Sequence, residues 1–385
     1  MEPDTPPADR RTAAVDDPRG AVRIVDTTCD VDVVCLGESM ITFLPGRPGP
    51  LADVPSFDRS IGGAESNVAC ALARAGHRAR WVSRVGADGF GEHLVRTVAA
   101  HGVDVSAVQR DPVRPTGVYF RTDGERPTGE PAAPDGAQPL SEVVYYRAGS
   151  AASAMSPANM PHAALTAGRV LHLTGITAAL SADCLALMRA LTGERAAGGP
   201  LVSFDVNYRV DLWRREPAAA GPAVLLDLAR GCDLVFVGED EAAAAWGVDG
   251  GPDAVRRALP EPGVLVVKQG GAGATAFVGD GPGVFAAAPR VDVVSPVGAG
   301  DAFAAGFLAA TLRGLPVRDR LRHGHVTAAA ALTVPGDLAV PCTREHADRL
   351  VALDDAAWER LRLGPGWTTR GRDGAQGEEP EVPSV

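Results

Sequence analysis

Residues 295–307 read Ser-Pro-Val-Gly-Ala-Gly-Asp-Ala-Phe-Ala-Ala-Gly-Phe, a small-residue turn followed by an apolar helical run. Asp301 falls in the first turn of that helix. Small residues let backbone N–H groups approach an anion closely, and a helix N-terminus carries partial positive charge. An anion cradle beside a carboxylate suits phosphoryl transfer to a hydroxyl, because the carboxylate can take the hydroxyl proton. On spacing alone, an N-capping Asp after a glycine-rich turn explains the pattern equally well.

The rest of the chain alternates short apolar runs with longer helical patterns. The runs are five or six residues long, apolar or β-branched, and bounded by Gly, Asp or Ser, which is typical of buried strands. They cover 31–36, 80–85, 169–173, 201–205, 234–237 and 264–268. The helical patterns cover 64–75, 91–101, 182–191, 223–229, 239–245 and 301–312. Such alternation predicts an α/β fold, a mostly parallel sheet with helices on both faces. Residues 275–278 and 283–286 predict strands that extend the sheet in an antiparallel sense.

Two stretches interrupt this alternation with β patterns of their own. One comprises 41–44 and 56–58, and the other 117–121 and 143–147. The second pair flanks a proline-rich loop at 122–142, which is long for a hairpin. We therefore predict a small separate sheet built from about 41–58 and 117–147.

The ends of the chain differ in composition from its centre. Residues 1–30 are rich in Pro, Asp and Arg and predict a disordered leader, and 364–385 predict a disordered tail. Between them we expect one domain over 31–345 and a C-terminal helix over 346–363.

Charge and composition exclude several classes of protein. The chain has 385 residues, 45% of them hydrophobic, and a formal net charge of −11. The acidic balance argues against nucleic-acid and anionic-membrane partners, which need basic patches. No apolar run reaches the roughly 18–20 residues of a membrane span. The six cysteines form no C-x-x-C pair and the N-terminus lacks an apolar signal core, so we expect a cytoplasmic protein.

Three motifs together carry a family resemblance. The signature from residue 298 to 307 resembles that of the ribokinase-like (PfkB) carbohydrate kinases. Residues 62–69, Gly-Gly-Ala-Glu-Ser-Asn-Val-Ala, are similar to that family's Gly-Gly-x-x-x-Asn-x-Ala segment, and 84–91 match its Val-Gly-x-Asp-x-x-Gly turn. The resemblance covers about 32–340. It implies a ribokinase-like fold with a β-sheet lid over a sugar site, ATP as phosphoryl donor and Mg²⁺ as cofactor.

Two further segments narrow the substrate. Residues 145–153 resemble the Tyr-Tyr-Arg-x-Gly-Ser-Ala stretch of 2-keto-3-deoxygluconate kinases, and 204–213 resemble their Asp-x-Asn-Tyr-Arg…Leu-Trp stretch. A Tyr hydroxyl and an Arg fork can hold the carboxylate of a sugar acid. Tyr145 and Arg147 lie two apart on a predicted strand and point the same way, which fits a pocket or a solvent face.

The resemblance assigns roles residue by residue. Asp301 is the general base, and the anion hole is the backbone of Gly298, Ala299 and Gly300. Substrate contacts fall on Gly62, Gly63, Asn67, Tyr119, Tyr145, Arg147, Asn207 and Arg209. We expect Gly63 to be needed because a side chain there would crowd the sugar.

The nucleotide and metal assignments rest on weaker patterns. Residues 268–274, Lys-Gln-Gly-Gly-Ala-Gly-Ala, follow a buried strand; a tight β-turn is the plainer interpretation, and the resemblance places ATP at Lys268, Gly270, Gly271 and Gly273. No Gly-x-x-x-x-Gly-Lys-Ser/Thr run occurs, which disfavours a P-loop. Glu241 matches the Glu of the family's Asn-x-x-Glu element for Mg²⁺, although Gly238 replaces the Asn and an acidic first helical turn explains it as well. Ser295 stands where many members of the family have an Asp that supports a monovalent-cation site, so activation by potassium is not assumed.

The leading interpretation is a kinase that phosphorylates the 6-hydroxyl of 2-dehydro-3-deoxy-D-gluconate. A fructokinase or other hexose kinase is the alternative, and a sugar sensor without catalysis is a third reading. An NAD-dependent dehydrogenase is disfavoured because residues 37–39, Gly-Glu-Ser, replace a Gly-x-Gly-x-x-Gly after the first strand. A homo-oligomer formed through the lid remains open.

Overall fold

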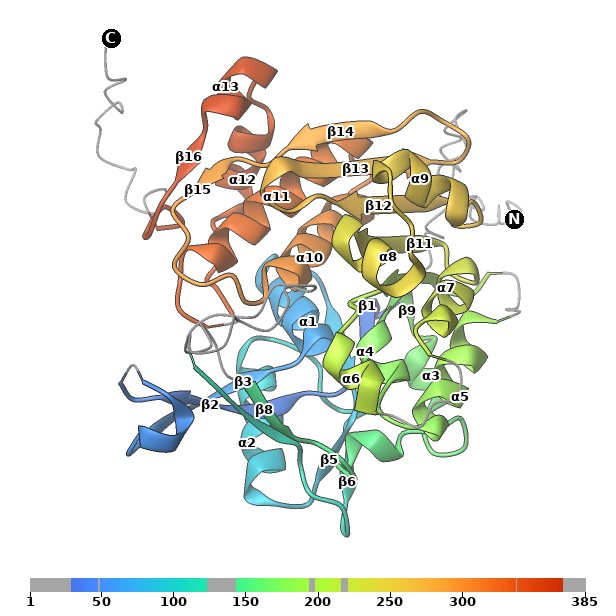
Figure 1. The fold of residues 1–385 in the computed structure, drawn as a ribbon, viewed down its shortest axis with the longest axis vertical. Coiled ribbons are helices and arrows are strands. Elements are labelled where there is room, and N and C mark those ends of the chain that lie inside the picture. Colours follow the sequence, from blue (N-terminus) through green and yellow to red (C-terminus); the bar gives the residue numbers. More distant parts are fainter. Residues whose placement is uncertain are drawn as a thin grey trace, which may run out of the picture.

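One large sheet occupies the centre of the computed structural model, which describes residues 29–47, 49–122, 143–193, 198–215, 221–336 and 338–369. Eight strands run in the order β14-β13-β12-β11-β10-β9-β1-β4 (Figure 1). Their bounds are β1 Val31–Leu36, β4 Ala79–Val82, β9 Gly168–Thr174, β10 Leu201–Asp205, β11 Leu234–Gly238, β12 Val264–Lys268, β13 Gly273–Val278 and β14 Val284–Ala287. The strands from β4 to β12 pair in parallel, and β13 and β14 are antiparallel, so the predicted sheet is confirmed.

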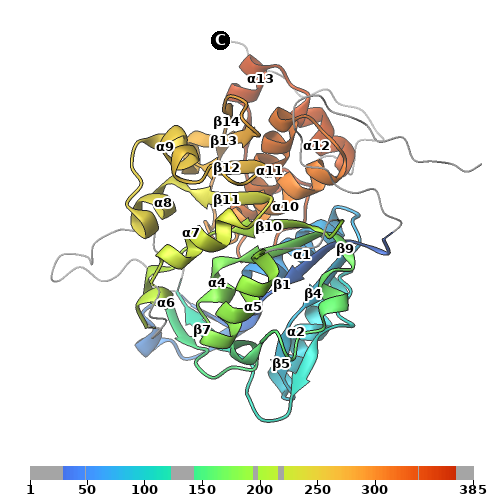
Figure 2. The ribbon, with the colours of Figure 1, turned by 90° about the vertical axis from the view of Figure 1, so that its right-hand side faces the viewer.

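Helices cover both faces of this sheet because both faces of its strands are apolar. Val34 and Leu36 of β1 belong to the core on one face, and Val33 and Cys35 to the core on the other. The first face carries α3 His162–Leu165, α4 Gly175–Ala178, α5 Ala182–Thr192, α6 Val210–Arg215, α7 Ala223–Arg230, α8 Glu239–Trp246 and α9 Gly251–Ala258. Figure 2 shows α4, α5 and α7 in front of the strands. The other face carries α1 Ala64–Arg74, α2 Gly89–Ala100, α10 Ala299–Leu312 and α11 Val317–Leu332.

A second sheet forms the predicted lid. Its four strands run in the order β3-β2-β7-β8 and lie beside the body in Figure 1. Their bounds are β2 Met40–Pro45, β3 Phe57–Gly62, β7 Val118–Arg121 and β8 Val143–Tyr146, with a short helix η1 Leu51–Asp53 between β2 and β3. Val144 and Tyr146 on the edge strand β8 are 41% and 64% exposed. Association of two copies through this edge stays a prediction.

Two sequence predictions about elements are wrong. The run at 80–85 is two strands, because the chain leaves the main sheet at Ser83 and β5 Arg84–Gly86 pairs with β6 Gln109–Asp111 instead. The helix predicted over 346–363 is α12 Arg344–Val351, α13 Asp355–Arg360 and strand β16 Arg362–Leu363, which pairs with β15 Arg290–Val291. The break occurs where Asp354 caps α13 by accepting from the N–H of Ala357.

The first residues of the predicted tail are ordered and pack on the domain. Residues 364–369 are described, and Trp367 is buried against Trp358 and Val326, since a Trp offers a large apolar surface. The predicted leader up to 28, the loop at 123–142 and the tail from 370 lie outside the described residues. Within the described ranges, no helix is long and apolar enough to cross a bilayer.

Candidate active site

The site lies where the carboxyl ends of β10, β11 and β12 meet the start of α10. In open α/β sheets, ligands bind outside this edge. The N-cap of α10 is Gly298, whose φ of +75° is a left-handed conformation that favours glycine. Asp301 follows in the first turn, so the predicted cradle and carboxylate occur at one helix end.

Two amides orient the Asp301 carboxylate. The Nδ2 of Asn67 donates to Oδ2 at 2.9 Å, and the Nδ2 of Asn207 lies 3.5 Å from Oδ1. A carboxylate only accepts hydrogen bonds, so both amides turn their nitrogens toward Asp301. Their carbonyl oxygens are buried, and neither has a hydrogen-bond partner within the described part of the chain. Both oxygens are therefore available to accept from hydroxyl groups of a ligand.

Backbone geometry at residue 207 fixes one of these amides. Asn207 has a φ of +40°, a left-handed conformation that Asn tolerates better than most side chains. Its N–H donates to Oδ1 of Asp205 at 3.3 Å. The turn after β10 therefore presents the Asn207 side chain to α10.

Lys268 places a positive charge at the same helix end. Its Nζ bonds to both oxygens of Asp205 at 3.0 and 3.1 Å, and a Cβ built on Gly300 would lie 3.8 Å from it. Burial alone would lower the pKa of Lys268, but the Asp205, Glu241 and Asp301 carboxylates outweigh it and raise that pKa. Lys268 thus places a cation beside the predicted anion hole of residues 298–300.

The carboxylate of Glu241 accepts hydrogen bonds from two backbone N–H groups. Its Oε2 accepts from the N–H of Gly238 at 2.5 Å and its Oε1 from the N–H of Tyr208 at 3.0 Å. Burial raises the pKa of Glu241, although Lys268 at 3.8 Å opposes this. Glu241 therefore caps α8 and holds the turn that carries Asn207.

The described residues form no cage of protein ligands alone for Mg²⁺. Across the described ranges, no group of three or more His, Cys, Asp or Glu side chains is arranged to hold a metal. Mg²⁺ usually binds through one or two carboxylates, waters and substrate phosphates. The carboxylates of Asp205 and Glu241 fit that pattern for an ion that arrives with a nucleotide, and the role of Glu241 toward it stays a prediction.

The remaining residues predicted for this end of the sheet lie close by. Gly270 and Gly271 form the short helix η3 Gly270–Ala272 after β12, and Gly273 begins β13. Arg209 is half-buried two residues after Asn207, and its charge lowers the pKa of Glu241 against the larger effect of burial.

The residues predicted to hold the sugar's other end lie on the lid. Tyr119 of β7 and Tyr145 of β8 are paired in register and stacked, with ring centroids 5.3 Å apart. The Arg147 guanidinium lies 5.6 Å from the Tyr145 ring centroid. Its Nε donates to Oε2 of Glu38 at 2.7 Å, so the predicted carboxylate fork already has a partner in the protein.

Gly62 and Gly63 connect the lid to α1. Gly62 ends β3, opposite Met40 of β2. A Cβ on Gly63 would lie 2.5 Å from the Glu38 carbonyl oxygen and 2.7 Å from the Cα of Ser39. The backbone at residues 38 and 39 is thus a reason of its own for glycine at 63, and the crowding of the sugar stays a prediction.

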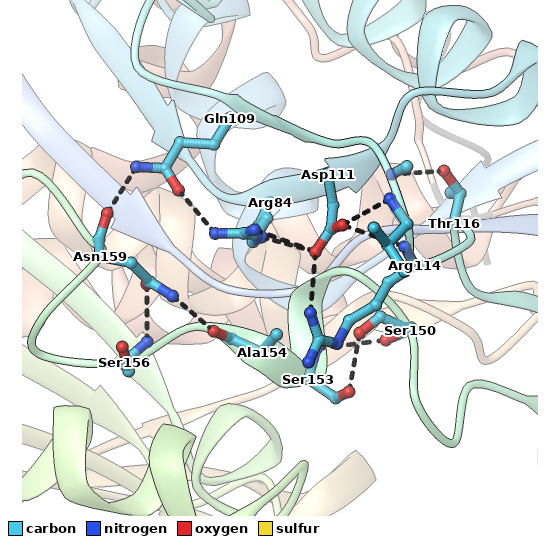
Figure 3. Close-up of polar contacts among 12 residues, drawn as sticks. Arg84, Gln109, Asp111, Arg114, Thr116, Ser150, Ser153, Ala154, Ser156 and Asn159 are labelled. Atoms are coloured by element: carbon cyan, nitrogen blue, oxygen red, sulfur yellow. Dashed lines mark hydrogen bonds and ion pairs between the residues drawn. The ribbon is translucent and has the colours of Figure 1, made fainter.

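A polar network fixes the segment that follows the lid (Figure 3). Arg84 donates to Asp111 at 3.0 Å and to Gln109 at 3.3 Å, and Gln109 donates to the carbonyl of Asn159 at 2.6 Å. Burial would raise the pKa of Asp111, but backbone N–H groups and Arg84 lower it to about 2. The network joins the small β5–β6 sheet to the segment from 150 to 159.

Sequence reasoning missed Asp205 and Glu38 as site residues. Each is an acidic residue at or just after the carboxyl end of a buried parallel strand, β10 and β1. That position could have singled them out, because strand carboxyl ends of an open α/β sheet border its ligand site.

The chain is similar in sequence to known carbohydrate kinases. The model of the pfkB family carbohydrate kinases matches residues 30–342. A 2-dehydro-3-deoxygluconokinase of Thermoproteus tenax is 36% identical over 84% of this chain and 95% of its own, and one of Bacillus subtilis is 35% identical over 82% and 94%. A probable chloroplastic fructokinase of Arabidopsis thaliana is 30% identical over 80% and 79%.

Solved structures share the fold. A PfkB protein of Polaromonas sp. JS666 superposes with a TM-score of 0.70 at 34% identity, over 83% of this chain and 99% of its own. A 2-dehydro-3-deoxygluconokinase of Thermotoga maritima gives 0.71 at 25% identity, over 84% and 98%. Fold and site define a sugar kinase of the ribokinase-like class. The chain belongs to the pfkB family of carbohydrate kinases.

Proposed function

We propose that this kinase transfers the γ-phosphoryl group of ATP to the 6-hydroxyl of 2-dehydro-3-deoxy-D-gluconate. The observation that carries the proposal is the Asp301 carboxylate, held by the Asn67 and Asn207 amides in the first turn of α10. The relatives from Thermoproteus tenax and Bacillus subtilis support this substrate.

In this mechanism Asp301 accepts the proton of the attacking hydroxyl. The backbone N–H groups of residues 298–300 hold the charge that develops on the phosphoryl oxygens, and Lys268 adds a cation at 3.8 Å from the Cβ position of Gly300. Phosphoryl transfer needs mainly positioning and electrostatic stabilisation, which these groups supply. The carbonyl oxygens of Asn67 and Asn207 accept from sugar hydroxyls.

Mg²⁺ would neutralise phosphate charge when it is bound with the nucleotide. Asp205 and Glu241 are the carboxylates that would face it, directly or through water. Gly270, Gly271 and Gly273 would border the nucleotide.

The acid end of the sugar would lie under the lid. Tyr119, Tyr145 and Arg147 face one another there, and a carboxylate would bind the part of the guanidinium that Glu38 leaves open. Arg209, beside Asn207, would contact the sugar or the transferred phosphoryl group. Gly62 and Gly63 would bound the sugar with backbone.

A fructokinase is the alternative because of one contact. The Glu38 carboxylate already balances the charge of Arg147, which reduces its net attraction for an acid. A fructokinase relative at 30% identity is consistent with this alternative.

The test is a coupled ADP-release assay of the purified protein with a panel of sugars and sugar acids. We expect 2-dehydro-3-deoxygluconate to give the highest kcat/KM, with fructose far below it. Faster turnover of fructose would establish the alternative. Sugar binding without any ADP release would make the protein a sensor.

A further inference from the structure

Glu38 is a buried carboxylate for which the proposed mechanism has no task. It follows β1 and is 2% exposed. Its Oε2 accepts from Nε of Arg147 at 2.7 Å and also pairs with Nη2 of Arg147. Its Oε1 accepts from the Ser150 hydroxyl at 2.6 Å. A strand end of the main sheet is thereby joined to the end of lid strand β8.

The contacts divide the Arg147 guanidinium into two edges. A guanidinium presents five N–H donors and can offer one edge through Nε and one through its two terminal nitrogens. Glu38 occupies the Nε–Nη2 edge. Nη1 bonds to no residue in the described ranges, and the Arg147 side chain keeps 12% exposure. The end-on edge is the part that a ligand carboxylate can reach.

Neighbouring groups hold this orientation from other directions. The ring of Tyr145 lies 5.6 Å from the Arg147 guanidinium carbon, and Tyr119 stacks on Tyr145 in turn. Ser150 lies 1% exposed at the start of the segment whose far end the Gln109–Asn159 contact fixes (Figure 3). The N–H of Ala151 also bonds to the Pro115 carbonyl at 2.8 Å. Glu38 and Ser150 are thus fixed points for a flexible Arg side chain.

We infer that Glu38 is a positioning residue for substrate specificity. It aligns Arg147 so that the end-on edge of the guanidinium meets the carboxylate of a sugar acid. The inference rests on the proposed function, because it assumes that the substrate carries a carboxylate. In this role Glu38 acts through Arg147 and is not a catalytic residue.

The two oxygens of Glu38 make two variants informative. Both Arg147 contacts go to Oε2 and the Ser150 contact goes to Oε1. A Gln can therefore keep its carbonyl toward Arg147 and its NH₂ toward Ser150, whose hydroxyl then accepts. Glu38→Gln removes the charge and keeps the alignment, whereas Glu38→Ala removes both.

The experiment compares 2-dehydro-3-deoxygluconate with 3-deoxyfructose, in which CH₂OH replaces the carboxylate. The acid-to-alcohol ratio of kcat/KM is measured in wild type, Glu38→Ala, Glu38→Gln, Arg147→Ala and the double Ala variant. We expect Glu38→Ala to lower the ratio about 10- to 100-fold by raising the KM of the acid. This is the contribution of one or two hydrogen bonds to a charged group. Glu38→Gln should keep or increase the ratio, because removing a nearby negative charge does not weaken the binding of an anionic substrate.

The double variant should match Arg147→Ala within about twofold, because a residue that acts through Arg147 has no effect without it. Glu92→Ala is the matched control, since it breaks the ion pair of Glu92 with Arg110 away from the site. A ratio unchanged in Glu38→Ala, or lowered equally in Glu38→Gln, overturns the inference and leaves the proposed function intact. No acid preference in wild type overturns both. If Glu38→Ala does not fold, Glu38→Asp replaces it, because the shorter side chain withdraws the carboxylate from Arg147; a lowered ratio supports the inference and an unchanged ratio overturns it.

Discussion

Asp301 differs from an ordinary acidic residue in a first helical turn. Gly298 is the N-cap of α10, so Asp301 lies three positions inside the helix and is not the capping residue. Its oxygens face side-chain amides from two other elements, α1 and the turn after β10. A carboxylate that served only the helix dipole would need neither amide.

Asp301→Asn should therefore remove most turnover and leave sugar affinity nearly unchanged. An amide cannot accept the hydroxyl proton, and loss of a general base costs about 10²- to 10⁴-fold in rate. The measurement is kcat in the ADP-release assay beside sugar affinity by calorimetry. Asp319→Asn is the matched control, because Asp319 occupies the first turn of the neighbouring helix α11. A variant that turns over like wild type but melts earlier would make Asp301 a structural residue.

Local motifs predicted some site residues and not others. Asp301, Asn67 and Lys268 were found because each belongs to a short motif with its own signal. The link from Arg147 to Glu38 was not found, since 109 residues separate them and their pairing depends on how the lid meets β1. From the sequence, Arg147 was expected to be free to bind a ligand carboxylate. In the fold its guanidinium already pairs with the Glu38 carboxylate.

At the scale of elements, a buried acid joins α1 to the end of β9. The side chain of Glu65 is completely buried, and its Oε1 accepts from the hydroxyls of Thr174 and Thr177 at 2.7 Å each. Its Oε2 has no hydrogen-bond partner in the part of the chain that is described. A Cβ on Gly37 would lie 2.0 Å from the Glu65 carboxyl carbon, so glycine at 37 makes room for this acid.

Glu65→Gln should stabilise the protein increasingly as pH rises from about 4.5 to 7. Burial raises the pKa of Glu65 to about 7, with the two Thr hydroxyls opposing. Across this window the native state holds a proton that the unfolded chain has lost, so the free energy of unfolding falls as pH rises. The loss approaches about 3 kcal/mol at pH 7, and Gln, which resembles the protonated acid, avoids it.

Urea unfolding at pH 5 and pH 7.5 measures this effect. The gain of Glu65→Gln over wild type should be larger at pH 7.5, and Glu359→Gln on the exposed side of α13 should show no such trend. An equal shift at both pH values would mean that Glu65 is ionised in the folded protein at neutral pH.

The predicted element boundaries agree with the structure where one buried apolar run forms one strand. The predicted ranges 31–36, 201–205 and 264–268 coincide with β1, β10 and β12. Prediction failed at 80–85 and 346–363, where the hydrophobic pattern continues across a change of partner. A pattern of apolar residues reports burial but not which sheet or helix provides it.

At the scale of the whole molecule, the proposed site combines residues of the main domain with residues of the lid. Asp301, Lys268 and the start of α10 belong to the main sheet and its helices, whereas Tyr119 and Tyr145 belong to the lid. Glu38 lies between β1 of the body and β2 of the lid, and Gly63 lies between β3 of the lid and α1. Both crossings touch one another, since a Gly63 Cβ would meet the Glu38 carbonyl. These two crossings therefore lie side by side, and the chain joins the lid to the body at two further places, before β7 and after β8.

Substrate and nucleotide together should close the lid, because transfer to sugar must exclude transfer to water. We expect amide hydrogen exchange in β7 and β8 to slow when 2-dehydro-3-deoxygluconate and a non-hydrolysable ATP analogue are both bound, and to slow less with either alone. Peptides from α12, packed against α11 on the body, serve as the internal control and should not change. Glu38→Ala should reduce the protection of β8 with the sugar acid, since the lid strand then loses its ion pair to the end of β1. Unchanged exchange in β7 and β8 with both ligands bound would mean that the lid is a fixed wall of the site.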